Sequence, residues 1–470
     1  MSEFKRSLGL FDSVMIVSGS MIGSGIFIVT AGMARNIGSA GWLLLAWVVA
    51  GVMTILAALS YGELSGMMPK AGGQYVYIQR AFGKLTAFLY GWTVFSVIQT
   101  GVIAAVAVAF AKFSAVFFPV LNPQNILLEL GFVKISASQL FAISSILLLT
   151  WLNTKGVENG KWLQTLFTAA KILALLALIC FGLYRAMGMD VLAHNFENMW
   201  SASRMGMENG VETHISLSGL ALISTLGLAM VGSLFSSDAW NNVTFIAGEI
   251  KDPHRNIPLS LFFGTLIVST LYILANLAYL ALLPLHDIQF AAEDRVGTAA
   301  AQVIFGEPAV YLMAGLIMIS TFGCNNGCIL AGSRLFYAMA KDGLFFKKAS
   351  TLNKNSVPEF ALWVQCFWAC ALCVSGHYGD LLEYATFASL LFYIVTVVGL
   401  FVLRKKEPEA ERPYKAFLYP WLPGLYIVVA SAFCLNLLYT SPVFTFAGLF
   451  IVALGIPIYY VSQRKGEAQL

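Results

Sequence analysis

Twelve long apolar segments, separated by polar loops, limit the folds open to this chain more than any other feature. They cover residues 9–34, 41–66, 84–111, 138–154, 162–184, 217–249, 258–283, 309–340, 359–376, 381–403, 418–439 and 442–463. A helix needs about 20 apolar residues to cross a bilayer. Only 11% of the residues are charged, against about 25% in soluble domains. We therefore predict an all-α integral membrane protein, with residues 1–470 forming one transmembrane domain of twelve helices.

Lysine and arginine are distributed unevenly between the loops on the two sides of this domain. With a cytoplasmic N-terminus, 20 of the 28 basic residues fall in cytoplasmic segments and 6 in outside segments, while Lys171 and Arg334 lie within spans. Loops rich in basic residues stay on the cytoplasmic side, and twelve spans return the chain to its starting side. We therefore expect both termini in the cytoplasm and the protein in the inner (cytoplasmic) cell membrane. Residues 1–9 show no cleavable signal pattern.

The first apolar segment is interrupted by small residues at its middle. The stretch Gly19-Ser20-Met21-Ile22-Gly23-Ser24-Gly25-Ile26-Phe27 holds three glycines and two serines within seven positions. Each glycine costs a helix interior roughly 1 kcal/mol relative to alanine, so we expect the helix to break here. A break exposes N–H groups on one side and carbonyl groups on the other, which suits the carboxylate and ammonium of a zwitterion. Close helix packing through Gly19 and Gly23 is the alternative.

The sixth segment contains a second interruption of the same kind. It reads Gly232-Ser233-Leu234-Phe235-Ser236-Ser237-Asp238-Ala239-Trp240-Asn241-Asn242. We expect the outer half-helix to end near Phe235 and the inner half-helix to begin near Asp238. Ser237 or Asp238 could then cap the inner half-helix. Direct contact between Asp238 and a substrate ammonium is an equally open interpretation.

The two interruptions lie in corresponding places of the chain, because five segments separate their starts. An odd offset inverts the second unit relative to the first in the membrane. This is the layout of a transporter built from two inverted five-helix repeats. We therefore expect a first repeat at 9–184, a second repeat at 217–403 and two additional helices at 418–463.

Three polar positions stand out inside the remaining segments. Lys171 lies ten residues beyond Lys161, which places it roughly 15 Å deeper at 1.5 Å per residue, near the bilayer centre. It should point inward as a tie between helices, and such a tie can replace a bound sodium ion. The run Ser320-Thr321-Phe322-Gly323-Cys324-Asn325-Asn326-Gly327 suggests a cavity wall or interhelical hydrogen bonds. Glu63 is either a gate carboxylate or a solvated helix end.

Other classes of protein fit this sequence poorly. The net charge of +4 does not indicate nucleic-acid binding, and the five histidines are scattered without metal-ligand spacing. All seven cysteines fall in apolar helical segments, so we expect neither a disulfide framework nor a metal cluster. No strand precedes the stretch from Gly19 to Gly25, so it is not a nucleotide loop. We therefore expect no enzyme activity, no cofactor and no metal site. A channel, which needs a continuous polar stripe, stays a rival class.

Several motifs in order resemble the amino acid–polyamine–organocation superfamily and, within it, the L-type amino acid transporter family. The resemblance covers most of residues 8–425. The motifs are Ile22 to Phe27, Glu63 to Gln74, Phe167-Thr168-Ala169-Ala170-Lys171, Trp240-Asn241 with Glu249 to Pro258, and Ser333-Arg334-Leu335-Phe336. The resemblance implies the LeuT-type 5+5 inverted-repeat fold and alternating-access transport of L-amino acids. It further implies sodium-independent exchange.

The resemblance also implies roles for individual residues. The amides of Ser24 and Gly25 would hold the substrate carboxylate, and the carbonyls of Ile22 and Phe235 would hold the ammonium. The Phe235 ring would be an outer gate; Glu63 stays a gate candidate from its place near the membrane edge alone. Lys171 would occupy the sodium position of coupled relatives, together with Ser320 and Thr321. The full expected substrate site comprises Ile22, Gly23, Ser24, Gly25, Phe235, Ser236, Ser237, Asp238, Trp240, Asn241 and Asn325.

Two departures from the family pattern bear on substrate and partners. Many relatives have Phe-Ala-Tyr-x-Gly-Trp where this chain has Phe235-Ser236-Ser237-Asp238-Ala239-Trp240. Small to medium neutral amino acids are the favoured substrates, while Asp238 leaves cationic amino acids or polyamines open. Proton-coupled symport with Lys171 as the titrating group is the alternative to exchange. The outside loop 112–137 lacks the cysteine that tethers a heavy subunit in animal relatives, so we expect a lone subunit, as in a bacterial member.

Overall fold

The computed structural model describes residues 6–130, 133–208, 211–375 and 378–467, and helices dominate it. Each of the twelve apolar segments is helical over most of its length. Within these described ranges, ten helices are long and apolar enough to cross a membrane, whereas Ala137–Asn153 and Glu359–Val374 are shorter apolar helices. The prediction of an all-α membrane protein is therefore confirmed, while the number of twelve spans stays a prediction.

The segments of the first half of the chain form the following elements. They are α1 (Leu10–Met21), α2 (Gly25–Ile37), α3 (Ala40–Met67), α4 (Gln74–Phe82), α5 (Lys84–Thr93), the π-helical turn η1 (Val94–Ile98), α6 (Gln99–Ser114), η2 (Pro119–Leu121), α7 (Ala137–Asn153), α8 (Val157–Ala186) and α9 (Val191–Phe196). Two short antiparallel hairpins interrupt the helical order, β1 (Ile126–Leu130) with β2 (Val133–Ser136), and β3 (Ser203–Glu208) with β4 (Val211–Ser216).

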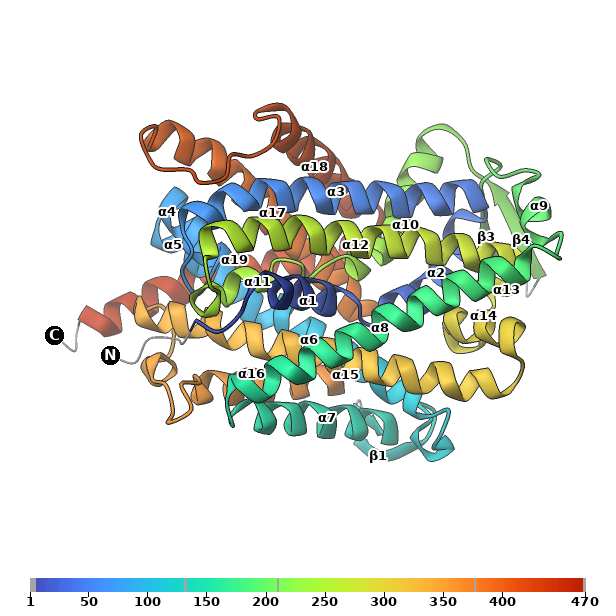
Figure 1. Ribbon diagram of the computed structural model, residues 1–470, viewed down its shortest axis with the longest axis horizontal. Helices are drawn as coiled ribbons and strands as arrows, with labels where there is room; N and C mark the ends of the chain where they lie inside the picture. Colours follow the sequence, from blue (N-terminus) through green and yellow to red (C-terminus); the bar gives the residue numbers. More distant parts are fainter. Residues whose placement is uncertain (1–5, 131–132, 209–210, 376–377, 468–470) are drawn as a thin grey trace.

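The second half of the chain is also mainly helical. Its elements are α10 (Gly219–Ser236), α11 (Asn242–Phe245), η3 (Ala247–Glu249), α12 (Pro253–Leu282), α13 (Leu285–Gln289), η4 (Ala292–Asp294), α14 (Val296–Phe305), α15 (Pro308–Lys341), η5 (Lys347–Ser350), α16 (Glu359–Ser375), α17 (Tyr378–Lys406), α18 (Trp421–Thr440) and α19 (Pro442–Glu467). The long helices run along the long axis of the molecule (Figure 1), with both chain ends toward one end and the β3–β4 hairpin at the other.

The first span lies at the centre of the molecule. α1 packs against α8, α11, α12 and α15, and α2 packs against α10. Nearly all of α2 is buried, whereas helices at the periphery turn apolar side chains outward. Leu173 of α8 is 65% exposed and Leu220 of α10 is 85% exposed. Large exposed apolar side chains on long helices are typical of a lipid-facing surface. The interrupted helices are therefore enclosed by the rest of the protein.

Both predicted interruptions are present. α1 ends at Met21 and α2 begins at Gly25, and α10 ends at Ser236. The expectation that the inner half-helix begins near Asp238 is wrong, because α11 begins at Asn242 and is only four residues long. Five residues, 237–241, separate α10 from α11, and among them Ala239 has a φ of 64°. A left-handed alanine cannot continue a right-handed helix, so the chain resumes helical structure only after it.

Candidate functional site

The first break presents a helix C-terminus and a helix N-terminus to each other. Ile22, the residue after α1, is extended with φ −74° and ψ 92°. Ser24 precedes α2 without a side-chain cap, and the N–H of Phe27 donates to the carbonyl of Ser24 at 3.0 Å. The N-terminal amides of a helix carry partial positive charge and the C-terminal carbonyls carry partial negative charge. The break therefore offers both kinds of group that a zwitterion needs, as the sequence predicted.

Lys171 of α8 binds the carbonyl side of this break. Its Nζ donates to the carbonyl oxygens of Gly19 and Ile22 at 2.7 Å each. The side chain is only 2% exposed, and among the described residues it has no carboxylate partner within ion-pair distance. The inward orientation predicted for Lys171 is what the structure shows. Its positive charge is balanced by the carbonyl dipoles at the end of α1.

α15 contacts the same end of α1 from another side. Ser320 Oγ donates to the carbonyls of Ile22 and Gly23 at 3.3 and 3.2 Å. Cys324 Sγ donates to the carbonyl of Ser20 at 3.0 Å, a contact that sequence reasoning missed. Thr321 differs from the expectation, because its hydroxyl bonds to Ile317 and Met318 of its own helix. α15 therefore joins the break through Ser320 and Cys324.

The hydrogen bonds of Ile22 limit the role that the family resemblance gives it. Its carbonyl oxygen accepts from both Lys171 and Ser320. A carbonyl oxygen has two lone pairs, so both are engaged here. An ammonium could bind this oxygen only if one of the two donors moved away.

The two breaks are in direct contact. A Cβ placed on Gly25 would lie 2.1 Å from Ser236 Oγ and 2.8 Å from Ser236 Cβ. The hydroxyl of Tyr272 on α12 lies 3.0 Å from the carbonyl of Met21 and 3.1 Å from that of Ser236. Tyr272 therefore bridges the last residues of α1 and α10. Sequence reasoning missed Tyr272, because both of its partners lie on other helices.

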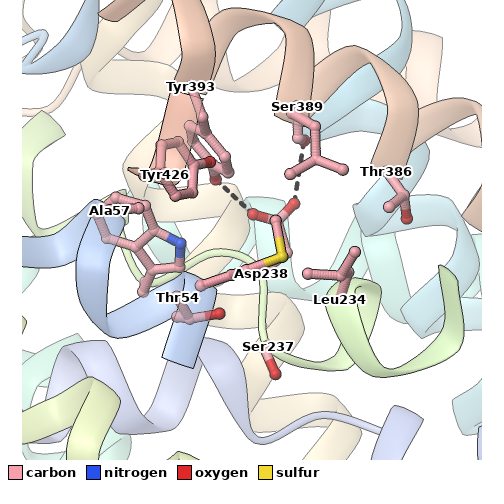
Figure 2. Close-up of a pocket in the computed structure, with 12 residues that line it drawn as sticks. Thr54, Ala57, Leu234, Ser237, Asp238, Thr386, Ser389, Tyr393 and Tyr426 are labelled. Atoms are coloured by element: carbon pink, nitrogen blue, oxygen red, sulfur yellow. Dashed lines mark hydrogen bonds between the residues drawn. The ribbon is translucent and has the colours of Figure 1, made fainter. Parts of the chain in front are cut away.

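Asp238 does not cap the inner half-helix. Asn241 occupies the N-cap position of α11, and no side chain forms a cap hydrogen bond there. The Asp238 carboxylate instead accepts from Tyr393 of α17 and from Ser389 at 3.0 Å (Figure 2). The predicted capping role of Ser237 and Asp238 is therefore wrong. α17 binds the carboxylate because two of its hydroxyl groups lie one helical turn apart and face the break.

A chain of hydrogen bonds extends from this carboxylate to α4 and α5. The Tyr393 hydroxyl also lies 3.3 Å from Asn241 Oδ1, and Asn241 Nδ2 donates to Gln74 Oε1 at 2.8 Å. The Tyr90 hydroxyl donates to the same Gln74 oxygen at 2.9 Å. Asn241 was expected in the site, whereas Gln74, Tyr90 and Tyr393 were not assigned to it.

Two small cavities lie against Asp238, each of about 20 Å³. The first, drawn in Figure 2, is lined by Ser237, Trp240, Ser389, Tyr393 and Tyr426 among others. The second lies between α5, α6 and the second break, and the π-helical turn η1 contributes Val94 and Ile98 to it. A cavity of this size holds about one water molecule. In this conformation neither cavity has room for an amino acid.

The remaining expected residues surround this centre or lie away from it. The ring of Phe235 is 8% exposed and Trp240 is 2% exposed, and Trp240 packs edge-on against Tyr61 at 4.8 Å between ring centroids. Asn325 is buried, and its Oδ1 has no hydrogen-bond partner. Asn325 lies on α15 within the polar run from Ser320 to Gly327, directly after Cys324.

Glu63 lies at the far end of α3, not at the breaks. Its carboxylate binds Arg404 at 2.6 and 2.9 Å, Arg412 at 3.1 Å and the N–H of Ala416 at 2.7 Å. It is fully buried, so the interpretation as a solvated helix end is wrong. A second buried pair joins Glu249 to Arg334 at 3.1 Å. Both pairs hold segments of different spans together.

Comparison with known proteins decides the family. A sequence model of amino acid permeases matches residues 8–461 of this chain. The chain belongs to the amino acid permease family. Large neutral amino acids transporter small subunit 2 of Mus musculus is 33% identical over 463 residues, which cover 97% of this chain and 81% of that protein. The Homo sapiens protein of that name is also 33% identical, with coverage of 97% and 80%. The b(0,+)-type amino acid transporter 1 of Mus musculus is 29% identical over 479 residues, with coverage of 100% and 90%.

Membership of this permease family confirms the resemblance read from the motifs. It also confirms that the chain is a multi-pass membrane transporter for amino acids and not an enzyme. The names of these relatives conflict with the expectation of a lone subunit. The relatives at 33% identity are named small subunits, a name that implies a further subunit in their assemblies.

Proposed function

We propose that this permease exchanges L-amino acids across the inner cell membrane by alternating access, without sodium. Its substrates are neutral amino acids of small to medium size. The ammonium of Lys171, held at 2.7 Å by the carbonyls of Gly19 and Ile22, carries the proposal. A sodium ion about 4 Å from this ammonium would be repelled by about 4 kcal/mol at an effective dielectric constant near 20. The fixed charge therefore replaces the ion.

The substrate binds across the two breaks in this proposal. Its carboxylate lies at the N-terminus of α2, at Ser24 and Gly25, and its ammonium at the C-terminal ends of α1 and α10. The ammonium contacts the carbonyls of Ile22 and Phe235 after the Ser320 hydroxyl, the more distant donor at 3.3 Å, has left the Ile22 oxygen. Because Gly25 touches Ser236 in this structure, the breaks must separate to admit the substrate. Alternating access consists of this separation toward one side of the membrane and then the other, with Phe235 as the outer gate.

The membrane arrangement follows from the same proposal. Residues 9–184 and 217–403 form two inverted five-helix repeats, and 418–463 adds two helices with both termini cytoplasmic. The chain ends lie toward the same end of the molecule in Figure 1, which supports this arrangement. The ion pairs of Glu63 and Glu249 then lie at the cytoplasmic end and close it.

The chain works without a disulfide-linked heavy subunit in this proposal. Loop 112–137 has no cysteine, and the seven cysteines are all free, with Cys180 alone exposed. The relatives named small subunits argue for an assembly instead. Non-reducing electrophoresis of the protein from its own membranes decides between the two, because a linked partner adds mass that a reductant removes.

A second substrate class is kept because of Asp238. Its carboxylate has no ion-pair partner among the described residues, so a cationic amino acid or a polyamine could supply one.

Proton-coupled symport with Lys171 as the titrating group is the rival mechanism.

Counterflow in liposomes tests the proposal. Purified protein is reconstituted into vesicles that are empty or preloaded with unlabelled substrate, and uptake of labelled alanine, leucine and arginine is measured in sodium or choline buffer with an inward proton gradient. We expect uptake of alanine and leucine only into preloaded vesicles, at equal rates in the two buffers. Accumulation in empty vesicles that Lys171→Ala abolishes would establish proton symport instead. Faster uptake of arginine than of alanine or leucine would establish the cationic class.

A further inference from the structure

We propose that Asp238 binds a proton each time the transporter closes around its substrate and releases it when the transporter opens. The inference rests on the proposed function and adds a second ionisable group, separate from Lys171, to the transport cycle.

The first argument is the charge environment of Asp238. The carboxylate lies at the break of a membrane-spanning segment, where an unpaired charge is strongly disfavoured. Its partners are the hydroxyl groups of Tyr393 and Ser389 and the backbone N–H of Ala239, none of which carries a positive charge. None of the described residues that line its two cavities is a lysine, an arginine or a histidine. With no cation nearby, the physical way to remove the buried charge is to bind a proton.

The titratable groups around Asp238 do not change this conclusion. Tyr393 and Tyr426 face it from α17 and α18, Tyr90 from α5 and Cys328 from α15. The α3 residues that line the first cavity are Met53, Thr54 and Ala57, which do not titrate. Phenols and thiols are uncharged at neutral pH at their ordinary pKa values. None of these groups can therefore neutralise the carboxylate.

The second argument is access. Asp238 keeps partial accessibility, and the two cavities beside it each have room for about one water molecule. A water molecule can deliver a proton to the carboxylate, whereas a side-chain ammonium with its hydrocarbon stem does not fit either cavity. In this closed conformation, therefore, a proton and not a substrate cation is the positive charge that can reach Asp238.

The hydrogen bonds can serve both protonation states. An ionised carboxylate accepts from the Tyr393 and Ser389 hydroxyls, as the structure shows. After a proton binds to Oδ2, that oxygen donates to Ser389 Oγ, because a serine hydroxyl can reverse its role. One O–H bond forms on the carboxylate and one breaks in a solvent acid, a hydronium ion or protonated buffer, which becomes water or free buffer base; the cavity water relays the proton. Opening the breaks hydrates the carboxylate and favours its charged form, so the proton leaves.

Binding calorimetry tests this proton uptake. The purified protein in detergent is titrated with L-leucine, and separately with L-arginine, in buffers of different ionisation enthalpy between pH 5 and pH 9. The slope of binding enthalpy against buffer enthalpy gives the number of protons taken up. We expect leucine binding to take up as much as about one proton in the wild type and none in Asp238→Asn, whose affinity for leucine is measured in the same titration.

Asp342→Asn is the matched control. Asp342 also accepts from a tyrosine hydroxyl, that of Tyr75 at 2.8 Å, but it lies after the end of α15, away from the breaks. Its substitution should leave the uptake unchanged. If Asp238→Asn fails to fold, Ser389→Ala replaces it. This variant removes one donor to the charged carboxylate, so proton uptake should move to higher pH.

Three results would overturn the inference. Leucine binding without proton uptake in the wild type is one, and uptake that persists in Asp238→Asn is another. The third is a pair of observations: Asp238→Asn abolishes arginine binding, and leucine binds without proton uptake. This pair would show that the carboxylate binds a cationic side chain of the substrate. In each case the amino acid still binds, so the proposed transport function stands. Absence of binding by either amino acid would overturn both proposals.

Discussion

Substitution of Gly25 by alanine should separate the two breaks and slow exchange. The new Cβ would lie 2.1 Å from Ser236 Oγ, 2.8 Å from its Cβ and 3.1 Å from its Cα. Carbon atoms in contact are about 3.5–4.0 Å apart, so α2 and α10 must move apart by roughly 0.5–1 Å. Because the third distance involves a backbone atom, rotating the serine side chain does not relieve the clash. Overpacking of this kind costs about 1–3 kcal/mol.

If the breaks return to this contact at Gly25 once the substrate is enclosed, the cost falls on the loaded closed state and exchange slows about 5- to 150-fold, because 1.4 kcal/mol is a factor of ten. Counterflow of labelled leucine in preloaded vesicles measures the rate. The double variant Gly25→Ala with Ser236→Gly should recover most of it, since both serine side-chain atoms are gone. Gly101→Ala on α6 is the control, because its Cβ would meet nothing within 4 Å. Wild-type exchange by Gly25→Ala would refute close contact of the breaks during transport.

Three further substitutions test separate parts of the structure. Lys171→Met leaves the carbonyls of Gly19 and Ile22 without their charged donor, which lowers the free energy of unfolding by about 1–3 kcal/mol. It should abolish counterflow, while the purified protein still elutes as a single species in size-exclusion chromatography. Ala239→Gly removes a left-handed alanine with φ 64° and should raise the free energy of unfolding by about 1 kcal/mol, seen as a higher Tm in detergent. Glu63→Gln leaves Arg404 and Arg412 without their shared carboxylate and should lower the free energy of unfolding by about 3 kcal/mol, in the same Tm assay.

Sequence reasoning located the breaks because their cause is local. Glycines and serines at the middle of an apolar run weaken a helix wherever the rest of the chain lies, and α1 does end beside Gly23. The burial of Lys171 was equally predictable, because the rise per residue places it far from both ends of its apolar segment. A cation buried among apolar helices has few acceptors, and the carbonyl end of a broken helix is one of them.

The partners of Asp238 could not be predicted in the same way. Ser389 and Tyr393 lie more than 150 residues away, and their contact depends on how α17 is rotated about its axis. Apolar periodicity does not give that rotation, because a helix buried in a membrane protein is apolar on most faces. The capping role proposed for Asp238 came from a local rule. It failed because hydroxyl donors from α17 reach the carboxylate and the chain stays non-helical to Asn241.

Lys171 and Asp238 together determine how charge moves in the cycle. Among the residues that the structure describes, neither has an ion-pair partner, so their charges cancel when Asp238 is ionised. A zwitterionic substrate adds no net charge. If closure adds a proton to Asp238, the loaded transporter is one charge more positive than the empty one. One-for-one exchange moves that charge equally in both directions, so it transfers no net charge and a membrane potential should drive no net accumulation of substrate. The empty transporter carries no net charge from this pair, so voltage should not drive its return either. A net electric current during one-for-one exchange would contradict this balance.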